Sequence, residues 1–464
     1  MTSLHNAPAK LRADALGLVE CIGQSVANIA PTLTPALNIA VVAAMAGVGS
    51  WLSFLIATVG VLFVALNISI LSRRHTLSGS YFIYIGRTIG PRAGLLAGWL
   101  MIGAYLATAI AISVSEVLFL ENLLASLNLK SLMPNAYAAL CGFISVAAVA
   151  AYRDVRLSAR FGLVLEVASI LMLVVITAIV VSQRGTVVDM RQIDFTGLGY
   201  VGVMSSLTFA VFAFVGFESS ATLARETRNP KRSVPLAVTL SALMSGMFFV
   251  AIAYFMVLGI GDDTRALGDT SAPFIAMTER AGLAAAGSAI YLGALISGLA
   301  CLLASINAAS RLMFSMARYD CFPVMLTKVH NHYHTPSAAV GLAVGVILLG
   351  SITVLPLGAL EAFGFAGTLA TFGFLAVYFL ICLAAPLDQF HAGTLSFTHL
   401  ILSCGGTSIM TFVILGSLYP VSPWPQSLLP YLFLIYLVTG GVLFLLLARK
   451  KPQVLQAIFL DKEA

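Results

Sequence analysis

The sequence is poor in charged residues. Only 9% of its 464 residues are Asp, Glu, Lys or Arg, and 59% are hydrophobic, whereas a soluble globular chain carries about 25% charged residues. The mean hydropathy is +0.99. So few charges cannot cover a water-facing surface, which excludes an ordinary soluble protein and predicts an integral membrane protein.

Other absences narrow the function. The chain has no GxxxxGK[ST] phosphate loop and no soluble nucleotide-binding segment, so primary active transport is not expected. No His, Asp or Cys constellation lies at membrane depth, so we expect neither an enzyme nor a resident cofactor or metal. The net charge of +6 is attributed to membrane topology rather than to nucleic-acid binding. The cysteines show neither metal-ligand spacing nor a disulfide framework, and are Cys21, Cys141, Cys301, Cys321, Cys382 and Cys404.

Two strings imitate known sites. A GxGxxG string at 197–202 lacks the strand and βαβ unit of a dinucleotide site. His330, His332 and His334 lie in a short inner loop rather than in a metal-binding arrangement. We assign no ligand to either string.

Twelve apolar segments are long enough to cross a bilayer at roughly 20 residues each. The first is too long for one ordinary helix and contains Pro31 and Pro35, each of which removes a backbone donor. We therefore interpret it as one broken helix. The predicted segments are 15–46, 49–71, 92–118, 135–152, 161–182, 202–222, 234–258, 283–314, 336–355, 360–384, 398–418 and 428–448.

The basic residues predict the orientation. With the N-terminus inside, 20 of the 25 Lys and Arg residues fall on the inner side and five on the outer side, as the positive-inside rule requires. The polar start that ends in Lys10 and Arg12 leads directly into an apolar segment, which argues against a cleavable signal. Both tails, 1–14 and 449–464, are expected in the cytoplasm.

The first and sixth crossings are both irregular. If the first ten crossings form two copies of five, at 15–200 and 201–385, these two occupy matching positions, and 386–448 adds two more. Paired interrupted helices are the best sequence indication of a transporter's binding site. Their exposed N–H ends suit a carboxylate and their carbonyl ends suit an ammonium, and an amino acid carries both groups.

Three motifs resemble one family. They are the sixth crossing with its loop (212–218, then Glu226, Asn229-Pro230, Arg232 and Pro235), the end of the eighth crossing (311–323), and Ser78 to Tyr81 with Gly98-Trp99. Together they are similar to the amino acid permease branch of the amino acid–polyamine–organocation superfamily. The resemblance implies an all-α, twelve-helix, LeuT-like fold of five plus five inverted helices with two extra. It also implies amino acids or related amines as substrates.

The sequence departs from that pattern in two places. The first crossing has an alanine-proline break where many members have a glycine-rich one. The fifth crossing, at 163–170, lacks the lysine that some proton-coupled members carry. A lysine-based coupling mechanism therefore does not transfer.

The predicted substrate contacts come from both irregular segments. Small side chains there let a ligand approach the backbone. Phe214 is expected to gate or touch the substrate, the alternative being ordinary packing. Asn28 is expected either to contact the ligand or to hydrogen-bond a neighbouring helix. The ten predicted contacts are Asn28, Ile29, Ala30, Pro31, Thr32, Phe212, Ala213, Phe214, Val215 and Gly216.

Four carboxylates fall within or at the ends of crossings. Glu20 and Glu116 lie near predicted segment ends and are expected to reach the interface. Glu166 is the deepest, so we hypothesise that it takes part in proton coupling or packs against the broken helices, the alternative being a carboxylate hydrogen-bonded to the neighbouring bundle. Glu218 is expected to cap freed backbone donors or to pair with an inner arginine.

The basic loop at 225–232 is the remaining candidate. Glu226 and Arg318 match the resemblance and are assigned a structural or gating role. The alternative is that the loop's charges only set the topology.

These observations predict a secondary active transporter, a symporter or exchanger, that moves an amino acid by alternating access across a bacterial cytoplasmic membrane. A proton or sodium gradient would drive it, with the bilayer and the small substrate as its partners. The alternative is a polyamine or other amine carrier, which needs Glu116, Glu166 or Glu218 to face the cavity. A transporter-like sensor is less favoured because the tails are short. The sequence leaves the particular substrate, the coupling ion and the oligomeric state open.

Overall fold

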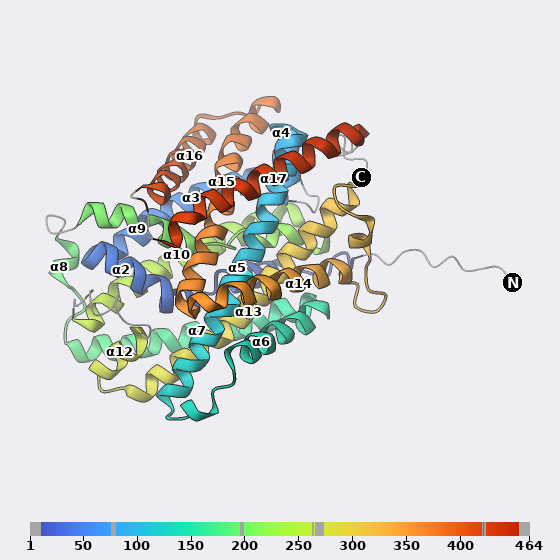
Figure 1. The fold of residues 1–464 in the computed structure, drawn as a ribbon. Helices are drawn as coiled ribbons and strands as arrows, with labels where there is room; N and C mark the ends of the chain where they lie inside the picture. Colours follow the sequence, from blue (N-terminus) through green and yellow to red (C-terminus); the bar gives the residue numbers. More distant parts are fainter. Residues whose placement is uncertain are drawn as a thin grey trace.

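The chain forms a bundle of helices in a computed structural model (Figure 1). The structure describes residues 11–75, 80–153, 155–194, 199–261, 264, 273–419, 421 and 424–453. Across these ranges there is no β-strand, only an isolated bridge between Leu16 and Thr227. Ser78, Gly79, Gly197 and the outer parts of both predicted tails lie outside the described residues.

The helical elements follow the predicted apolar segments. Each of the twelve segments contains helix. In chain order the α-helices are α1 (Leu18–Ile29), α2 (Ala40–Ala46), α3 (Ser50–Arg74), α4 (Ser80–Thr88), α5 (Pro91–Ser126), α6 (Ala136–Tyr152), α7 (Val155–Arg184), α8 (Met190–Ile193), α9 (Tyr200–Phe212), α10 (Pro230–Ile260), α12 (Pro273–Arg280), α13 (Ala284–Arg318), α14 (Ser337–Val354), α15 (Ala359–His391), α16 (Phe397–Leu418) and α17 (Leu429–Lys450).

Nine helical segments within the described ranges are long and apolar enough to cross a membrane. Two further apolar helices, α6 and α9, are shorter. This confirms an all-helical, multi-pass membrane protein. The count of twelve crossings and the inverted repeat of five plus five stay predictions.

Local sequence explains where key helices begin and end. The Gly17 N–H, just before α1, donates to Glu20 Oε2 (2.8 Å), so a carboxylate satisfies a donor at this helix start. Pro230 occupies the first turn of α10, where its missing N–H costs nothing. The same helix stops at Gly261, whose φ of +76° suits a left-handed cap.

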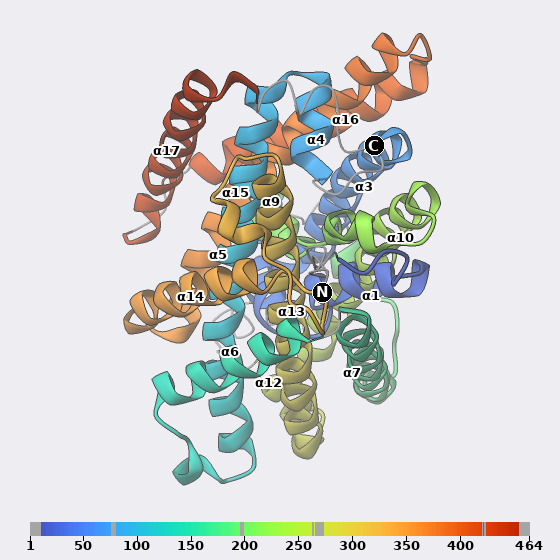
Figure 2. The same ribbon diagram turned by 90° about the vertical axis from the view of Figure 1, so that its right-hand side faces the viewer.

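The centre of the bundle is built on α5. It packs along α13 and α15, while α3 packs along α10, and α1 contacts α7, α10 and α13. In Figure 2, α16 and α17 lie toward opposite edges of the bundle, where α16 packs on α15 and α3 and α17 on α5 and α15. The buried ends of α1 and α9 therefore lie inside a shell of longer helices.

One expectation about depth is wrong. The third crossing was predicted to end at 118, which placed Glu116 near the interface. In the structure α5 continues to Ser126, and the Glu116 side chain is fully buried. The extra turns move Glu116 from the predicted end into the interior.

Candidate functional site

The two irregular helices break where the sequence predicts. The first break follows α1, where Ala30 adopts a left-handed φ of +51° and Pro31 comes next. The second break follows α9 and runs from 213 to 218, with Gly216 at φ +99°. We call these two stretches the first break (30–32) and the second break (213–218).

The end of α1, just before the first break, touches the second break. A Cβ atom added to Gly216 would lie 2.4 Å from Asn28 Nδ2 and 2.7 Å from Asn28 Cβ. Both the positive φ and this contact require glycine. The Asn28 side chain, at the end of α1, therefore packs directly against the Gly216 backbone of the second break.

A small cavity lies at this junction. Its volume is about 10 Å³, roughly the space that one water molecule needs. Among the predicted contacts, Asn28, Ile29, Phe212 and Val215 line it. The other lining residues are Leu33, Thr34, Asn38, Thr108, Ile112, Cys301 and Phe363. The structure therefore shows the site contracted.

The remaining predicted contacts lie behind this wall. Ala30, Pro31 and Thr32 form the first break itself, and their side chains are buried. Phe214 is 1% exposed and packs edge-on against Phe249 of α10, with ring centroids 5.3 Å apart. Of the two predicted phenylalanines, Phe212 lines the cavity and Phe214 does not.

Side chains satisfy the N–H groups that follow the first break. The Thr32 N–H donates to Glu166 Oε1 (3.1 Å), and Ser297 Oγ donates to the same oxygen (2.8 Å). The Leu33 N–H donates to Ser297 Oγ (3.4 Å). These N–H groups begin the second half of helix one, and the N-terminal end of a helix favours an anion. A carboxylate from α7 already lies there.

Helix α13 also holds the carbonyl side of the first break. Cys301 Sγ donates to the Asn28 carbonyl (3.1 Å), and Ser305 Oγ donates to Asn28 Oδ1 (2.6 Å). Thr34 Oγ1 donates to the Ile29 carbonyl (2.7 Å). Sequence reasoning missed these partners, because hydroxyl and thiol side chains within an apolar run carry no distinctive spacing.

Glu218 is held by tyrosines. Tyr105 of α5 donates to its Oε1 (2.8 Å), and Tyr378 of α15 donates to its Oε2 (2.6 Å). Tyr81 of α4 donates to the Glu218 carbonyl (2.8 Å). Of the two predicted alternatives, the arginine partner is wrong, because phenol groups from α5 and α15 donate to both carboxylate oxygens.

Glu226 forms a buried ion pair. Arg311 of α13 donates from Nε to Glu226 Oε2 (2.6 Å) and from Nη2 to Oε1 (3.4 Å), and both side chains are 2% exposed. Asn307 Oδ1 accepts from Arg311 Nη1 (3.0 Å). Arg318, also predicted to have a structural or gating role, ends α13 with an exposed side chain. The signal that could have found Arg311 was its place as a basic residue inside an apolar crossing.

Glu116 differs from the other carboxylates. Neither of its oxygens has a hydrogen-bond partner among the described residues, and its side chain is fully buried. Its Oε1 lies against Gly298 of α13, where an added Cβ would come within 1.7 Å of it. Leu33, which lines the cavity, adjoins the same glycine.

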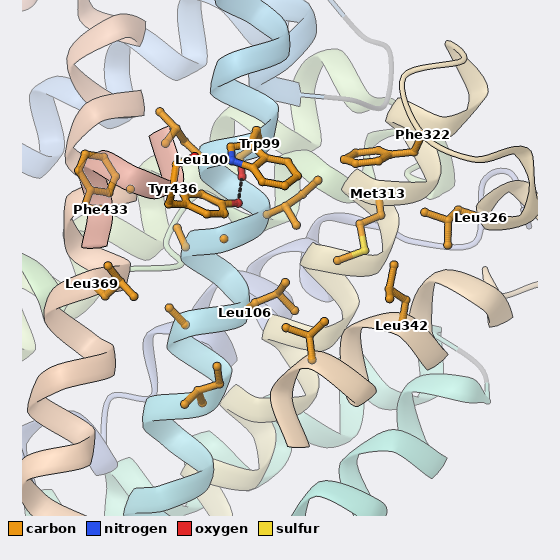
Figure 3. A pocket seen from close by; sticks show the side chains of 17 residues that line it. Trp99, Leu100, Leu106, Met313, Phe322, Leu326, Leu342, Leu369, Phe433 and Tyr436 are labelled. Carbon is orange, nitrogen blue, oxygen red and sulfur yellow. Dashed lines mark hydrogen bonds between the residues drawn. The ribbon is translucent and has the colours of Figure 1, made fainter. Parts of the chain in front are cut away.

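A larger cavity of about 400 Å³ lies between α5, α14, α15 and α17 (Figure 3). Trp99 and Tyr436 stack at its edge with ring centroids 4.9 Å apart, and Tyr436 Oη donates to the Trp99 carbonyl (2.6 Å). The side chains that line it are almost all apolar, and neither break contributes to it. It lacks the convergent polar groups that orient a polar ligand.

The histidines of the loop between α13 and α14 form a turn. His330 Nδ1 accepts from the N–H groups of His332 and Tyr333, both at 3.2 Å. In the part of the chain that the structure describes, no group of three or more His, Cys, Asp or Glu side chains could hold a metal ion.

Two helices broken at mid-bundle, meeting around a polar cavity inside a shell of apolar spans, define a polytopic membrane transporter of the broken-helix class. The amino acid permease family model matches residues 21–457. The chain therefore belongs to the amino acid permease family of the amino acid–polyamine–organocation superfamily, as the sequence motifs predict.

Several curated relatives share this family. The chain is 30% identical over 317 residues to the low-affinity putrescine importer PlaP of Escherichia coli K12, covering 65% of this chain and 66% of the importer, just under two thirds of its length. It is 25% identical over 436 residues to the branched-chain amino acid permease BcaP of Bacillus subtilis, with 89% of each chain covered. It is also 25% identical over 357 residues to a methylthioribose transporter of Bacillus subtilis, covering 73% of this chain and 74% of the relative.

Proposed function

We propose that this chain is a secondary active transporter, a symporter or exchanger, that moves an amino acid across a bacterial cytoplasmic membrane by alternating access. Twelve crossings, with the first ten arranged as two inverted sets of five and both termini in the cytoplasm, complete the proposal. The broken helices supply the ligand contacts.

The observation that carries this proposal is the contact between the end of α1 and the second break. Asn28 and Gly216 are in contact, and a polar cavity opens beside them. A cavity of about 10 Å³ is too small for any amino acid, because it has room for roughly one water molecule. Substrate entry therefore requires α1 and the second break to separate, which is the motion that alternating access needs.

Glu166 is our candidate for ion coupling. Its carboxylate holds the Thr32 N–H, which is a donor that a substrate carboxylate would also use. Two carboxylates cannot share this donor cheaply, since like charges repel. A proton or sodium ion that neutralises Glu166 would release the Thr32 N–H to the substrate, and binding of ion and substrate would be linked.

A second candidate is a carrier of an amine that lacks a carboxylate. Glu166 already occupies the anion-favouring helix end, and Glu116 is buried without a partner. The similarity to a putrescine importer supports this candidate, whereas the similarity to a branched-chain amino acid permease supports the first.

A binding screen followed by transport separates the two. Purified protein is heated with single amino acids, diamines and monoamines, and ligands that raise the melting temperature are then tested for uptake into proteoliposomes. Proton and sodium gradients are imposed separately, with protein-free liposomes as the control. Uptake of an amino acid that responds to one gradient supports the primary proposal. Stabilisation and uptake by diamines alone would replace it with the second candidate.

A further inference from the structure

Glu116 is an ionisable side chain that no hydrogen bond among the described residues explains. It is fully buried and both of its oxygens lack a hydrogen-bond partner among the described residues. An ionisable residue at membrane depth is expensive and is a functional-site candidate by default. Unlike Glu218 and Glu226, it is not explained by a contact within the bundle.

The backbone of α13 leaves room for this carboxylate. Gly298 has no side chain, and an added Cβ would lie 1.7 Å from Glu116 Oε1. Any other residue at 298 would displace the carboxylate. Glu116 therefore lies in a recess that the sequence keeps open.

The recess adjoins the substrate cavity. Thr108 and Ile112 line that cavity, and Glu116 follows them at the same four-residue spacing, so the three lie on one stripe of α5. Each step along this stripe is about 6 Å. Leu33 lines the cavity and also adjoins Gly298, so its side chain lies between the cavity and the carboxylate.

The neighbouring groups favour a cation. Glu166 Oε2 is also buried without a partner, and both carboxylates act electrostatically on Cys301, another cavity residue. An ammonium offers three donors and no acceptor. The apolar side chains of Leu33 and Ile112 would contact the aliphatic stem that leads to such a group.

We propose that Glu116 is a subsite for a second cationic nitrogen of the substrate, one helical turn beyond the cavity at the breaks. The inference rests on the transport function proposed above and specifies its substrate. The first amine lies at the breaks, a stem of about four carbons, as in lysine, passes Leu33, and the distal ammonium pairs with Glu116. A basic amino acid and a diamine both carry this chemistry.

The test uses two matched ligand pairs with the full-length protein in proteoliposomes. L-lysine is compared with L-norleucine, which lacks the distal ammonium, and 1,4-diaminobutane is compared with butylamine. We expect a preference for the dication of roughly ten-fold or more in at least one pair, because a buried charged hydrogen bond is at stake. Preference within the first pair identifies a basic amino acid, and preference within the second pair alone identifies a diamine.

Three variants assign this preference to the recess. Glu116→Gln keeps the shape and removes the charge, so the dication preference should fall toward one-fold. Gly298→Ala keeps the charge but displaces the carboxylate, and should also reduce the preference. Glu121→Gln is the matched control, because Glu121 lies on the same helix, half-exposed, and pairs with Lys130 at the surface. Melting curves with and without ligand verify that each variant is folded and report binding independently of uptake.

The outcomes separate the subsite from the transport function. Uptake of amines with equal rates within both pairs, or a preference that survives in Glu116→Gln, overturns the subsite and leaves the transporter intact. Failure of the wild-type protein to bind or take up any amine overturns the proposed function, and the subsite with it.

Discussion

Replacing Arg311 by methionine removes the cation that neutralises Glu226. The two side chains are 2% exposed and are joined by contacts of 2.6 and 3.4 Å, so neither charge is screened by water. Removing one partner of such a pair leaves an uncompensated buried charge, which costs about 3–5 kcal/mol. We expect Arg311→Met to lower the unfolding free energy by this amount.

The double variant isolates the pair itself. With Arg311→Met and Glu226→Gln together, no buried charge remains unpaired. The unfolding free energy of the double variant should therefore lie within about 1 kcal/mol of the wild-type value. The measurement is an unfolding titration in mixed micelles, followed by tryptophan fluorescence. Uptake in proteoliposomes then shows whether the pair also controls opening of the inner end of the bundle.

A surface pair provides the control. Lys130 and Glu121 are 3.4 Å apart, with side chains 70% and 46% exposed, so Glu121→Gln should cost less than about 1 kcal/mol. If Arg311→Met lowers the unfolding free energy no more than this control does, burial does not increase the cost of breaking the Arg311–Glu226 pair. If the double variant is as unstable as the single one, the cost comes from packing and the electrostatic argument is refuted.

Three further substitutions probe the centre of the bundle. Glu166→Gln should change how uptake depends on an imposed pH or sodium gradient, and an unchanged dependence would remove it from coupling. Gly216→Ala should lower the apparent ligand affinity at least ten-fold, as measured by ligand-induced thermal stabilisation, because the new Cβ would lie 2.4 Å from Asn28 Nδ2. Unaltered affinity would show that Asn28 can move away without affecting the ligand site. Tyr378→Phe removes a donor to Glu218 and should lower the unfolding free energy by about 1.5–3 kcal/mol, measurable in the same micelle titration.

The broad architecture was predictable because it depends on composition and on the lengths of apolar runs, which can be read from the sequence without knowing the packing. The low charge content and the lengths of apolar runs indicate spanning helices regardless of how those helices pack. The two breaks were predictable for a local reason, since Pro31 removes a backbone donor and Gly216 permits a positive φ. The structure places both breaks within a few residues of these signals.

The partners of the buried carboxylates were not predictable, because they come from distant helices. Glu166 meets Ser297 across 131 positions and Glu218 meets Tyr378 across 160. A single sequence shows that such a charge needs compensation but not which helix provides it. The predicted position of Glu116 near the interface was wrong for a related reason, since the apolar run ends near 118 while the helix itself continues to Ser126.

Four buried carboxylates therefore differ in the partners that their oxygens have within the bundle. Glu226 is neutralised by Arg311, and Glu218 accepts two phenol hydrogens, so both are explained by the static bundle. Glu166 is shared, with one oxygen on the Thr32 N–H and Ser297 and the other without a partner. Glu116 has no partner at all among the described residues. A buried polar group without a hydrogen bond is costly. Glu116 and Glu166 have oxygens without partners among the described residues, so they are the two side chains on which we place the subsite and ion-coupling proposals.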